Sequence, residues 1–163
     1  MELIKFKDKS YPLFQSKGFA AKFAFPFAKE VCKGYGYDIG CCKKEWCFDG
    51  AIGIDLTFKN GYDAFHLPEE KVDYIFSSHM VEHVDHWVDC LDYWTTKIKS
   101  GGTLFLYLPH PSQEYWLPYN NRKHIHVLYP EMIEKYLKQA PYKNIFVSGV
   151  DLNNSYALMA EKI

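Results

Sequence analysis

Arginine is nearly missing from this chain of 163 residues, in which Arg122 is the only one. Arginine is the side chain that binds phosphates and guanine edges in a bidentate manner. The 19 lysine and arginine residues are balanced by 20 acidic residues, which gives a formal net charge of -1. A nearly neutral protein has no overall field that attracts polyanions. We therefore do not expect a nucleic-acid partner.

Long apolar runs and closely paired cysteines are also lacking. No stretch approaches the ~20 apolar residues of a membrane span. The most apolar N-terminal stretch, 19–28, is broken by Lys22 and Pro26 and has no cleavage pattern typical of a signal peptide. The five cysteines contain no C-x-x-C pair, so neither a disulfide framework nor a zinc ribbon is expected. These absences favour a cytoplasmic protein without a membrane span.

Aromatic residues, in contrast, are abundant at 18 % of the chain. This is more than a core of this size needs, and we expect some rings to line a pocket or an interface. The length predicts a single domain over 1–163. Within it we separate an aromatic N-terminal arm or lid (1–33) from a core (34–163). Residues 10–33 are expected to form either a helix packed on the core or a mobile lid.

From Tyr35 onward, short apolar runs alternate with helix-like stretches, which is typical of an α/β sheet with mostly parallel strands. A helix over 86–99 is expected to end at Gly101–Gly102, and Pro130 is expected at the first position of another helix. The last two strands are close in sequence and predict a C-terminal antiparallel hairpin with its turn at 151–154. The strands are expected near 35–39, 51–55, 72–77, 103–108, 144–150 and 156–161.

Chemistry-bearing residues follow the strand ends, where an open α/β sheet binds its ligands. The first strand ends Y-D-I-G-C-C (37–42) and the second ends G-I-D-L (53–56). Glycine lets the backbone approach a ligand, and an acid at the end of the second strand can accept both hydroxyls of a ribose. Each feature alone also has an ordinary interpretation, because Asp38 could cap a turn and Asp55 could be a solvated strand end.

Taken in order, these motifs resemble those of the class I S-adenosylmethionine-dependent methyltransferases over about 35–108. The family's first motif, D-x-G-x-G, is matched by Asp38 and Gly40, and its strand-end acid by Asp55. The run S-S-H-M-V-E-H (77–83) is similar to the family's S-x-x-L-E-H signature. The resemblance implies a Rossmann-like methyltransferase sheet and S-adenosylmethionine as cofactor. The implied cofactor-binding residues are Asp38, Gly40, Cys42, Asp55, Leu56, Asp63, Ala64, Ser77 and Ser78.

The chain departs from the family pattern in two places. Cys42 stands where the second motif glycine is expected, and its β-carbon would crowd the methionine part of the cofactor if its backbone φ is positive. Asp55 follows Asp38 by only 17 positions, so the usual crossover helix must be short or irregular. The cofactor site would then be more open.

Two histidines at strand ends are the catalytic candidates for assisting methyl transfer, His79 and His110. His79 could instead cap the following helix, and His83 is interpreted as structural. By resemblance to insertions that cover the acceptor in this family, Tyr115, Trp116, Arg122 and His124 are the expected substrate-binding residues. The alternative is a loop that packs its rings on the domain.

A metal site is not expected, although His124 and His126 form H-x-H, which could bind an ion together with His110 or Glu114. The preferred hypothesis is S-adenosylmethionine-dependent methyl transfer to a small-molecule or sugar acceptor. The alternatives are a non-catalytic methyltransferase-like binding or scaffold protein and, less favoured, a metal-dependent hydrolase that uses His124 and His126. A nucleic-acid methyltransferase is disfavoured by the single arginine.

Overall fold

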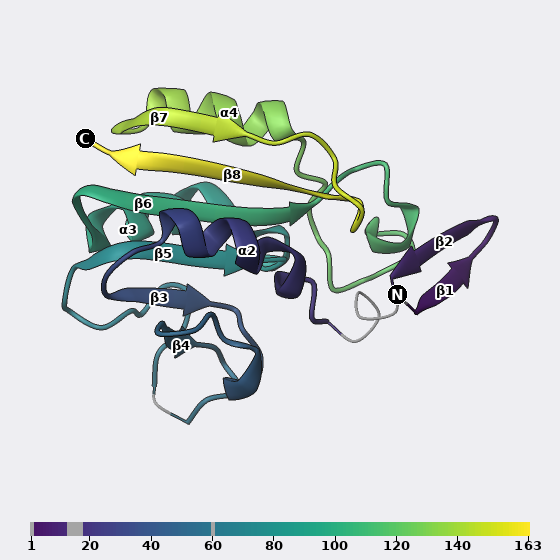
Figure 1. Cartoon of the computed structure of the whole chain (residues 1–163), viewed down its shortest axis with the longest axis horizontal. Helices are drawn as coiled ribbons and strands as arrows, with labels where there is room; N and C mark the ends of the chain where they lie inside the picture. The colour runs from purple at the N-terminus through teal and green to yellow at the C-terminus, as the bar shows by residue number, and fades with distance from the viewer. Residues whose placement is uncertain (1, 13–17, 60) are drawn as a thin grey trace.

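A six-stranded, mostly parallel sheet forms the centre of the molecule in a computed structural model that describes residues 2–12, 18–59 and 61–163 (Figure 1). Its strand order is β4-β3-β5-β6-β8-β7, in which β8 alone runs antiparallel to its two neighbours. The expected α/β class and the C-terminal antiparallel hairpin are confirmed. The strands are β3 (Gly36–Ile39), β4 (Ile52–Ile54), β5 (Val72–Ser78), β6 (Ile98–Pro109), β7 (Tyr142–Val147) and β8 (Ser155–Lys162).

Two amphipathic helices cover one face of the sheet. They are α3 (Trp87–Lys97) and α4 (Pro130–Gln139), and Pro130 begins α4 as expected, where its missing N–H is not needed. Their buried residues, such as Trp94 and Leu137, pack on the aliphatic side chains of the strands. One expectation was wrong in detail, since Gly101–Gly102 does not end α3. The helix ends at Lys97, and β6 runs through both glycines.

The opposite face is covered by one helix, α2 (Ala21–Val31), and by aromatic rings. Figure 1 shows α2 lying across β5 and β6, which agrees with its contacts with both strands. Beneath and beside the helix, Phe76 stacks on Phe48 at 5.2 Å and on Phe105 at 5.4 Å between ring centroids. Small residues on the helix, Ala24 and Ala28, let it approach these rings. Much of the aromatic excess therefore fills this second core.

The connection from β3 to β4 contains only a single 3-10 turn, η1 (Lys44–Trp46). This confirms the short or irregular crossover expected from the sequence. A hollow of about 450 Å³ lies beside β4, and Phe48, Gly53 and Phe58 are among the residues that line it. None of the predicted cofactor residues is among those that line it.

An N-terminal hairpin, which the sequence did not predict, precedes the core. Its strands β1 (Leu3–Phe6) and β2 (Lys9–Pro12) pair antiparallel, outside the main sheet. The hairpin lies beyond the carboxyl ends of β3, β5 and β6 (Figure 1). Of the arm expected at 1–33, residues 1 and 13–17 lie outside the described part. No described helix is long and apolar enough to cross a membrane.

The two outer strands of the sheet are irregular or short. At one edge β4 has three residues. At the other edge, the pairing of β7 with β8 shifts register between Lys143 and Phe146, and Asn144 there has φ of 51°.

Candidate active site

The loop after β3 is held closely against the residues that follow β5. The Gly40 N–H donates to the carbonyl of Ile54 at 2.8 Å, and Gly40 has φ of 91°. A β-carbon at this position would lie 2.4 Å from Cγ of Met80, a distance that real β-carbons do not tolerate. Glycine is therefore required at position 40, both for its backbone angle and for this contact.

The carboxylate of Asp55 ties the ends of β3 and β4 together. One oxygen accepts the Cys42 N–H at 2.8 Å, and the other accepts the Thr57 N–H at 2.9 Å. The Thr57 hydroxyl in turn donates to the Cys42 carbonyl at 2.6 Å. Cys42 has φ of 63°, so the positive angle on which its predicted crowding depends is present. Leu56, which follows Asp55 directly, is 85 % exposed.

Cys41 and Cys47 are joined in a disulfide that closes the loop between them. The sequence did not suggest this bond, because the two cysteines are six residues apart and match no paired motif. The cysteines outside it, Cys32, Cys42 and Cys90, are free, and only Cys42 is exposed.

Asp38 is buried behind the loop rather than exposed at the strand edge. Its side chain accepts the Phe48 N–H at 2.6 Å, and the residue is 1 % exposed. Burial raises its pKa to about 7, and the nearby charge of Asp55 acts in the same direction, whereas the Phe48 hydrogen bond opposes both. Asp38 therefore organises the turn at Phe48 from inside.

The segment around Asp63 forms a small bridge that is anchored to α3. Asp63 accepts the Phe65 N–H at 2.7 Å and lies 3.0 Å from the ring Nδ1 of His66. Partial burial tends to raise its pKa, but the hydrogen bonds from His66 and Phe65 leave it lowered. The Ala64 carbonyl accepts Nε1 of Trp94 at 2.7 Å, which fixes the segment on the helix. Its neighbour Phe65 is 41 % exposed, so this side of the site is open.

The two serines at the end of β5 point to opposite faces. Ser77 is buried and donates to the Ile39 carbonyl at 2.8 Å. The Ser78 hydroxyl, by contrast, is a buried oxygen without a hydrogen-bond partner among the described residues. Ser78 pairs with Tyr107 across the sheet. Its hydroxyl is thus a polar group that a bound ligand could satisfy.

His79 follows directly and is held in a strained left-handed backbone conformation with φ of 49°. Its N–H donates to the Tyr107 carbonyl at 2.8 Å, and Nε2 lies 2.9 Å from Oγ of Ser155. Trp116 meets the ring edge to face, at 6.1 Å between centroids. Burial lowers the pKa of His79 well below its ordinary value, and His124 and His83 act in the same direction, so its ring is neutral near pH 7.

Ser155 is positioned by a hydrogen-bond network in the turn before β8. Tyr107 donates its hydroxyl to Asp151 at 2.5 Å, and the other carboxylate oxygen of Asp151 accepts the Ser155 N–H at 3.0 Å. Asn153 bridges Tyr107 and Ser155 through its amide nitrogen, at 3.0 Å and 3.2 Å. Asn154 has φ of 51°, as expected for an asparagine in this turn. The turn was predicted from the sequence, but its contact with His79 was not.

A buried acid, Glu82, lies among three imidazoles one turn beyond His79. Its Oε1 is 3.8 Å from Nε2 of His124 and 3.9 Å from both Nδ1 of His79 and Nε2 of His83. Burial raises the pKa of Glu82 to about 8 and lowers that of His124 to about 3. Burial also lowers the pKa of His83, although hydrogen bonds to the backbone of Lys123 and His79 oppose it. Glu82 was not among the predicted site residues. The sequence feature that could have indicated it is an acidic residue in the otherwise largely apolar segment M-V-E-H-V (80–84).

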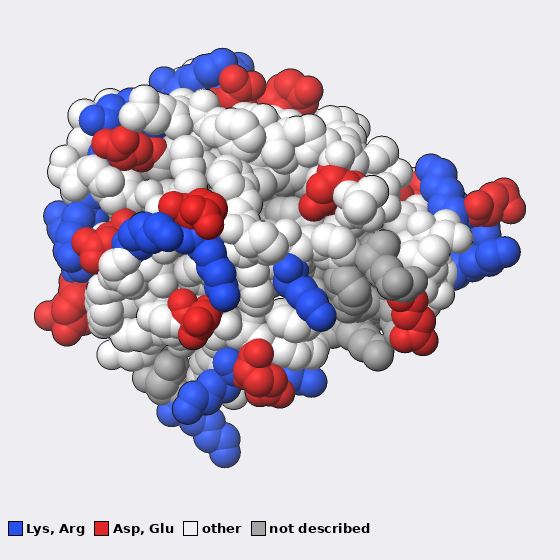
Figure 2. Space-filling view, in the orientation of Figure 1, with Lys and Arg blue, Asp and Glu red and all other residues white. Residues whose placement is uncertain are grey.

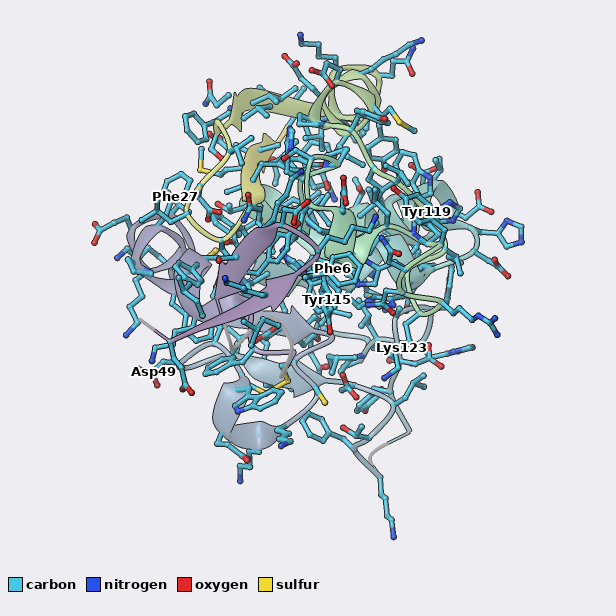
Figure 3. The ribbon with its side chains drawn as sticks, turned by 90° about the vertical axis from the view of Figure 1, so that its right-hand side faces the viewer. Phe6, Phe27, Asp49, Tyr115, Tyr119 and Lys123 are labelled. Atoms are coloured by element: carbon cyan, nitrogen blue, oxygen red, sulfur yellow. A yellow bond between two sulfur atoms is a disulfide. The ribbon has the colours of Figure 1, made fainter. Side chains whose placement is uncertain are left out.

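The expected acceptor segment is divided between buried and exposed positions. Trp116 stacks flat on His124 at 5.0 Å between centroids, and His124 is 3 % exposed. Tyr115 packs edge to face on Phe6 of the N-terminal hairpin at 5.3 Å, and Figure 3 shows these two residues together. Arg122 is exposed.

The remaining predicted residues lie apart from this cluster. His110 is bound to Ser112 through Nδ1 at 2.8 Å, and its N–H donates to the Asn154 carbonyl at 2.9 Å. The pair His124 and His126 is split, because Nε2 of His126 lies 3.0 Å from the Asp85 carbonyl. Glu114 forms ion pairs with Lys7 and Lys9. The structure therefore does not assemble the H-x-H site with His110 or Glu114.

Comparison with known proteins identifies the fold. The chain is similar to a S-adenosylmethionine-dependent methyltransferase structure from Thermotoga maritima, with a TM-score of 0.72, 17 % identity and 92 % of each chain covered. It is also similar to one from Archaeoglobus fulgidus, with a TM-score of 0.64, 20 % identity, and 91 % of this chain and 94 % of the other covered. A third similar structure is the N-methyltransferase NodS from Bradyrhizobium japonicum, solved with S-adenosyl-L-homocysteine, with a TM-score of 0.59, 13 % identity, and 96 % and 89 % covered.

Sequence comparison assigns the family. No curated protein sequence matches the chain. A family profile described as "Methyltransferase domain" does match, over residues 22–106, from the first turn of α2 to the last third of β6. This range is more than half of the chain and contains the loop of Gly40, Asp55 and the run that ends in Glu82 and His83. The chain therefore belongs to this methyltransferase family. It is a class I methyltransferase, and its methyl donor is S-adenosylmethionine.

Proposed function

We propose that the methyl acceptor is a small molecule or a sugar. The observation that carries this proposal is the aromatic cover at the end of β5, where Trp116 lies against both His79 and His124. Aromatic rings beside hydrogen-bonding groups suit flat metabolites and sugar rings. The Thermotoga maritima structure is described as a possible histamine N-methyltransferase, which is consistent with an acceptor of this size.

The surface charge supports a small acceptor over a nucleic acid. Figure 2 shows the basic and acidic side chains interspersed on the visible face, with no continuous basic stripe. Nucleic-acid binding depends on clustered positive charge and is strongly salt-dependent. The nearly balanced composition offers little of this on the chain as a whole.

The residues at the strand ends fit the cofactor. Gly40 and Cys42 would pass close to its methionine part, Asp55 and Leu56 would meet the ribose, and Asp63 and Ala64 would meet the adenine. Ser78 offers the unpartnered hydroxyl described above. The cofactor supplies an electrophilic methyl group in line with the acceptor. His110 and His79 remain the proposed residues for accepting the acceptor's proton.

Calorimetric titration with S-adenosylhomocysteine tests the cofactor residues. Asp55→Ala should weaken binding by roughly 1.5–3 kcal/mol, because a charged hydrogen-bond partner is lost. Asp55→Asn keeps an oxygen for the backbone N–H groups, so it separates loss of the ribose contact from disruption of the loop. Asp89→Ala, an exposed acid in the first turn of α3, is the matched control and should bind as the parent does. Equal affinity in all three variants would place the cofactor elsewhere.

A transfer assay with radiolabelled S-adenosylmethionine tests the acceptor class. We expect label to pass to members of a panel of small amines, phenols and sugars, and turnover to fall in His79→Ala or His110→Ala by more than cofactor affinity falls. Transfer confined to transfer RNA, DNA or protein would overturn the proposal. So would an absence of transfer to any small acceptor by protein that binds S-adenosylhomocysteine.

A further inference from the structure

Glu82 is a completely buried ionisable group, and neither of its carboxylate oxygens has a hydrogen-bond partner on another residue in the part of the chain that the structure describes. A buried carboxylate without a partner is costly and is usually paired or bound to a metal. The backbone of Glu82 is hydrogen-bonded to a distant segment, because its carbonyl accepts the N–H groups of Ile125 and His126 at 3.0 Å and 3.1 Å. The position of the side chain is thus built into the fold.

The imidazoles beside this carboxylate come from two distant parts of the chain. His83 belongs to the 3-10 turn η2 (Val81–His83), whereas His124 lies about 40 residues later, in the segment that carries Trp116. The two rings meet edge to face at 4.5 Å between centroids. One ligand atom each from Glu82, His83 and His124 lies within 4.8 Å of the other two.

In both histidines Nε2 is the ring nitrogen that lies near Oε1 of Glu82. Nδ1 of His83 lies 2.6 Å from the Lys123 carbonyl, which can only accept, so Nδ1 carries the proton and Nε2 keeps its lone pair. His124 also hydrogen-bonds the backbone of Trp116, and its Nε2 is the atom that faces Glu82. Metal-binding histidines typically have such a backbone partner on their second nitrogen.

We propose that Glu82, His83 and His124 form a divalent metal site and that the ion it takes is Zn²⁺. Two imidazoles and one carboxylate are a typical zinc ligand set that keeps one position open for water. Bonds of about 2.0–2.1 Å at tetrahedral angles place neighbouring ligand atoms about 3.4 Å apart. The distances from Oε1 of Glu82 to the two Nε2 atoms, 3.9 Å and 3.8 Å, need to close by only about half an ångström. The His83 side chain, 32 % exposed, gives the ion a path.

The ion would fasten the aromatic cover to the core. Glu82 and His83 follow β5 directly, and His124 supports Trp116, which lies over His79. If Glu82 and His83 on one side and His124 on the other bound the same ion, the segment that carries Trp116 and His124 would be joined to the end of β5. This role does not depend on which acceptor is methylated.

Metal content and metal titration of the whole protein test the site. After treatment with a chelator and dialysis, titration with ZnCl₂ should give one ion per chain and a raised melting temperature. Glu82→Gln and His83→Ala should each weaken Zn²⁺ binding roughly tenfold or more. His83 is the more exposed residue, so His83→Ala tests the site even if Glu82→Gln fails to fold. His126→Gln, two residues beyond His124 and bound to the Asp85 carbonyl, is the matched control and should bind as the parent does.

A second set of donors must be excluded in the same experiment. Asp38, Cys41 and Cys47 also lie within ligand distance of one another, and the two cysteines would become thiolate donors if their disulfide were reduced. The titration is therefore repeated on Cys41→Ser/Cys47→Ser protein, and Co²⁺ replaces Zn²⁺ so that thiolate ligands would reveal themselves by sulfur-to-metal absorption. Binding that persists in this variant, without sulfur absorption, supports the site at Glu82. The proposal is overturned if binding disappears with the cysteines, if Glu82→Gln and His83→Ala bind as the parent does, or if folded protein binds no Zn²⁺.

Discussion

At the scale of the residue, Cys42 stands where the motif D-x-G-x-G has its second glycine. A left-handed φ of 63° places a β-carbon where glycine would leave room, and it costs an L-residue roughly 1–2 kcal/mol. We expect Cys42→Gly to bind S-adenosylhomocysteine several-fold more tightly, by about 1 kcal/mol. Stability should change little, because relief of strain is offset by greater freedom of the unfolded chain.

Calorimetry measures this change, and Cys42→Ala is its control. Alanine keeps the β-carbon and removes only the thiol. If alanine tightens binding as much as glycine does, the sulfur is responsible, and the argument from backbone angle fails.

Asp38 gives a prediction about pH. Its pKa in the folded state, about 7, exceeds the ordinary value of an aspartate. Between about pH 4 and pH 7 the unfolded chain therefore releases a proton that the folded chain retains, and the free energy of unfolding falls as pH rises. Asp38→Asn removes this contribution while keeping an oxygen for the Phe48 N–H. The loss of stability from pH 5 to pH 8 should shrink by about 2 kcal/mol.

Urea unfolding of parent and variant at the two pH values measures this difference, in which the other titrating groups cancel. The groups around Asp38 that bear on it are Asp55, Cys32 and Tyr74. Asp89→Asn, at an exposed position, should keep the pH dependence of the parent. An equal slope in Asp38→Asn and the parent would show that Asp38 is ionised in the folded protein at neutral pH.

At the scale of the element, α2 depends on small residues for its approach to the sheet. Ala28 is 0 % exposed and lies in the aromatic core of Phe76 and Phe105. Ala28→Leu should lower the free energy of unfolding by about 1–3 kcal/mol, because the added carbons overfill a packed interface. Denaturant midpoints measure the effect. Lys29→Leu, at the neighbouring exposed position, should change the midpoint little, and equal effects of the two substitutions would show that α2 is not closely packed.

The same helix shows what the sequence could and could not predict. Strands were predictable because their apolar runs are short and end in glycine or polar residues, as at Asp38 and Asp55. In α2, by contrast, Pro26 lies inside the helix, and the alternation of alanine with phenylalanine suits both a packed helix and a mobile arm. Gly101–Gly102 was misleading, because glycine serves both as a helix stop and inside an irregular strand. Gly102 lies inside β6, where a β-carbon would be 2.7 Å from the Asp73 carbonyl.

The candidate site was predictable to a similar extent. Family motifs indicated the loop of Gly40 and the acid Asp55, because both are local patterns. Contacts between distant segments, such as His124 with Glu82 or Ser155 with His79, depend on how loops cross the sheet edge. The path of these loops leaves no periodic pattern in the sequence, so the contacts between distant segments could not be predicted from it.

At the scale of the whole molecule, the N-terminal hairpin is an addition to a complete sheet. It contributes no strand to the six-stranded sheet. Its residues Phe6 and Tyr11 contact Tyr115, which lies in the segment that also carries Trp116. We expect a chain lacking residues 2–12 to fold and to bind S-adenosylhomocysteine within about threefold of the parent, a difference of under 1 kcal/mol. Acceptor turnover should fall, because Tyr115 loses its support.

Circular dichroism, calorimetry and the transfer assay together measure this outcome. Phe6→Ala removes one of the ring contacts without shortening the chain and should lower turnover in the same direction. If the shortened chain is unfolded, the hairpin is part of the core. If turnover is unchanged in both variants, the hairpin does not support the acceptor site.

The outer strands of the sheet bear on how copies of the chain meet. An edge strand that is long and regular invites backbone pairing with another molecule, and such pairing leads to aggregation. Here β4 is only three residues long, and β7 loses its regular register between Lys143 and Phe146. Neither edge offers a neighbouring copy a straight ladder of free N–H and C=O groups. Any self-association of this protein should therefore use side-chain surfaces and not a sheet that continues from one molecule into the next.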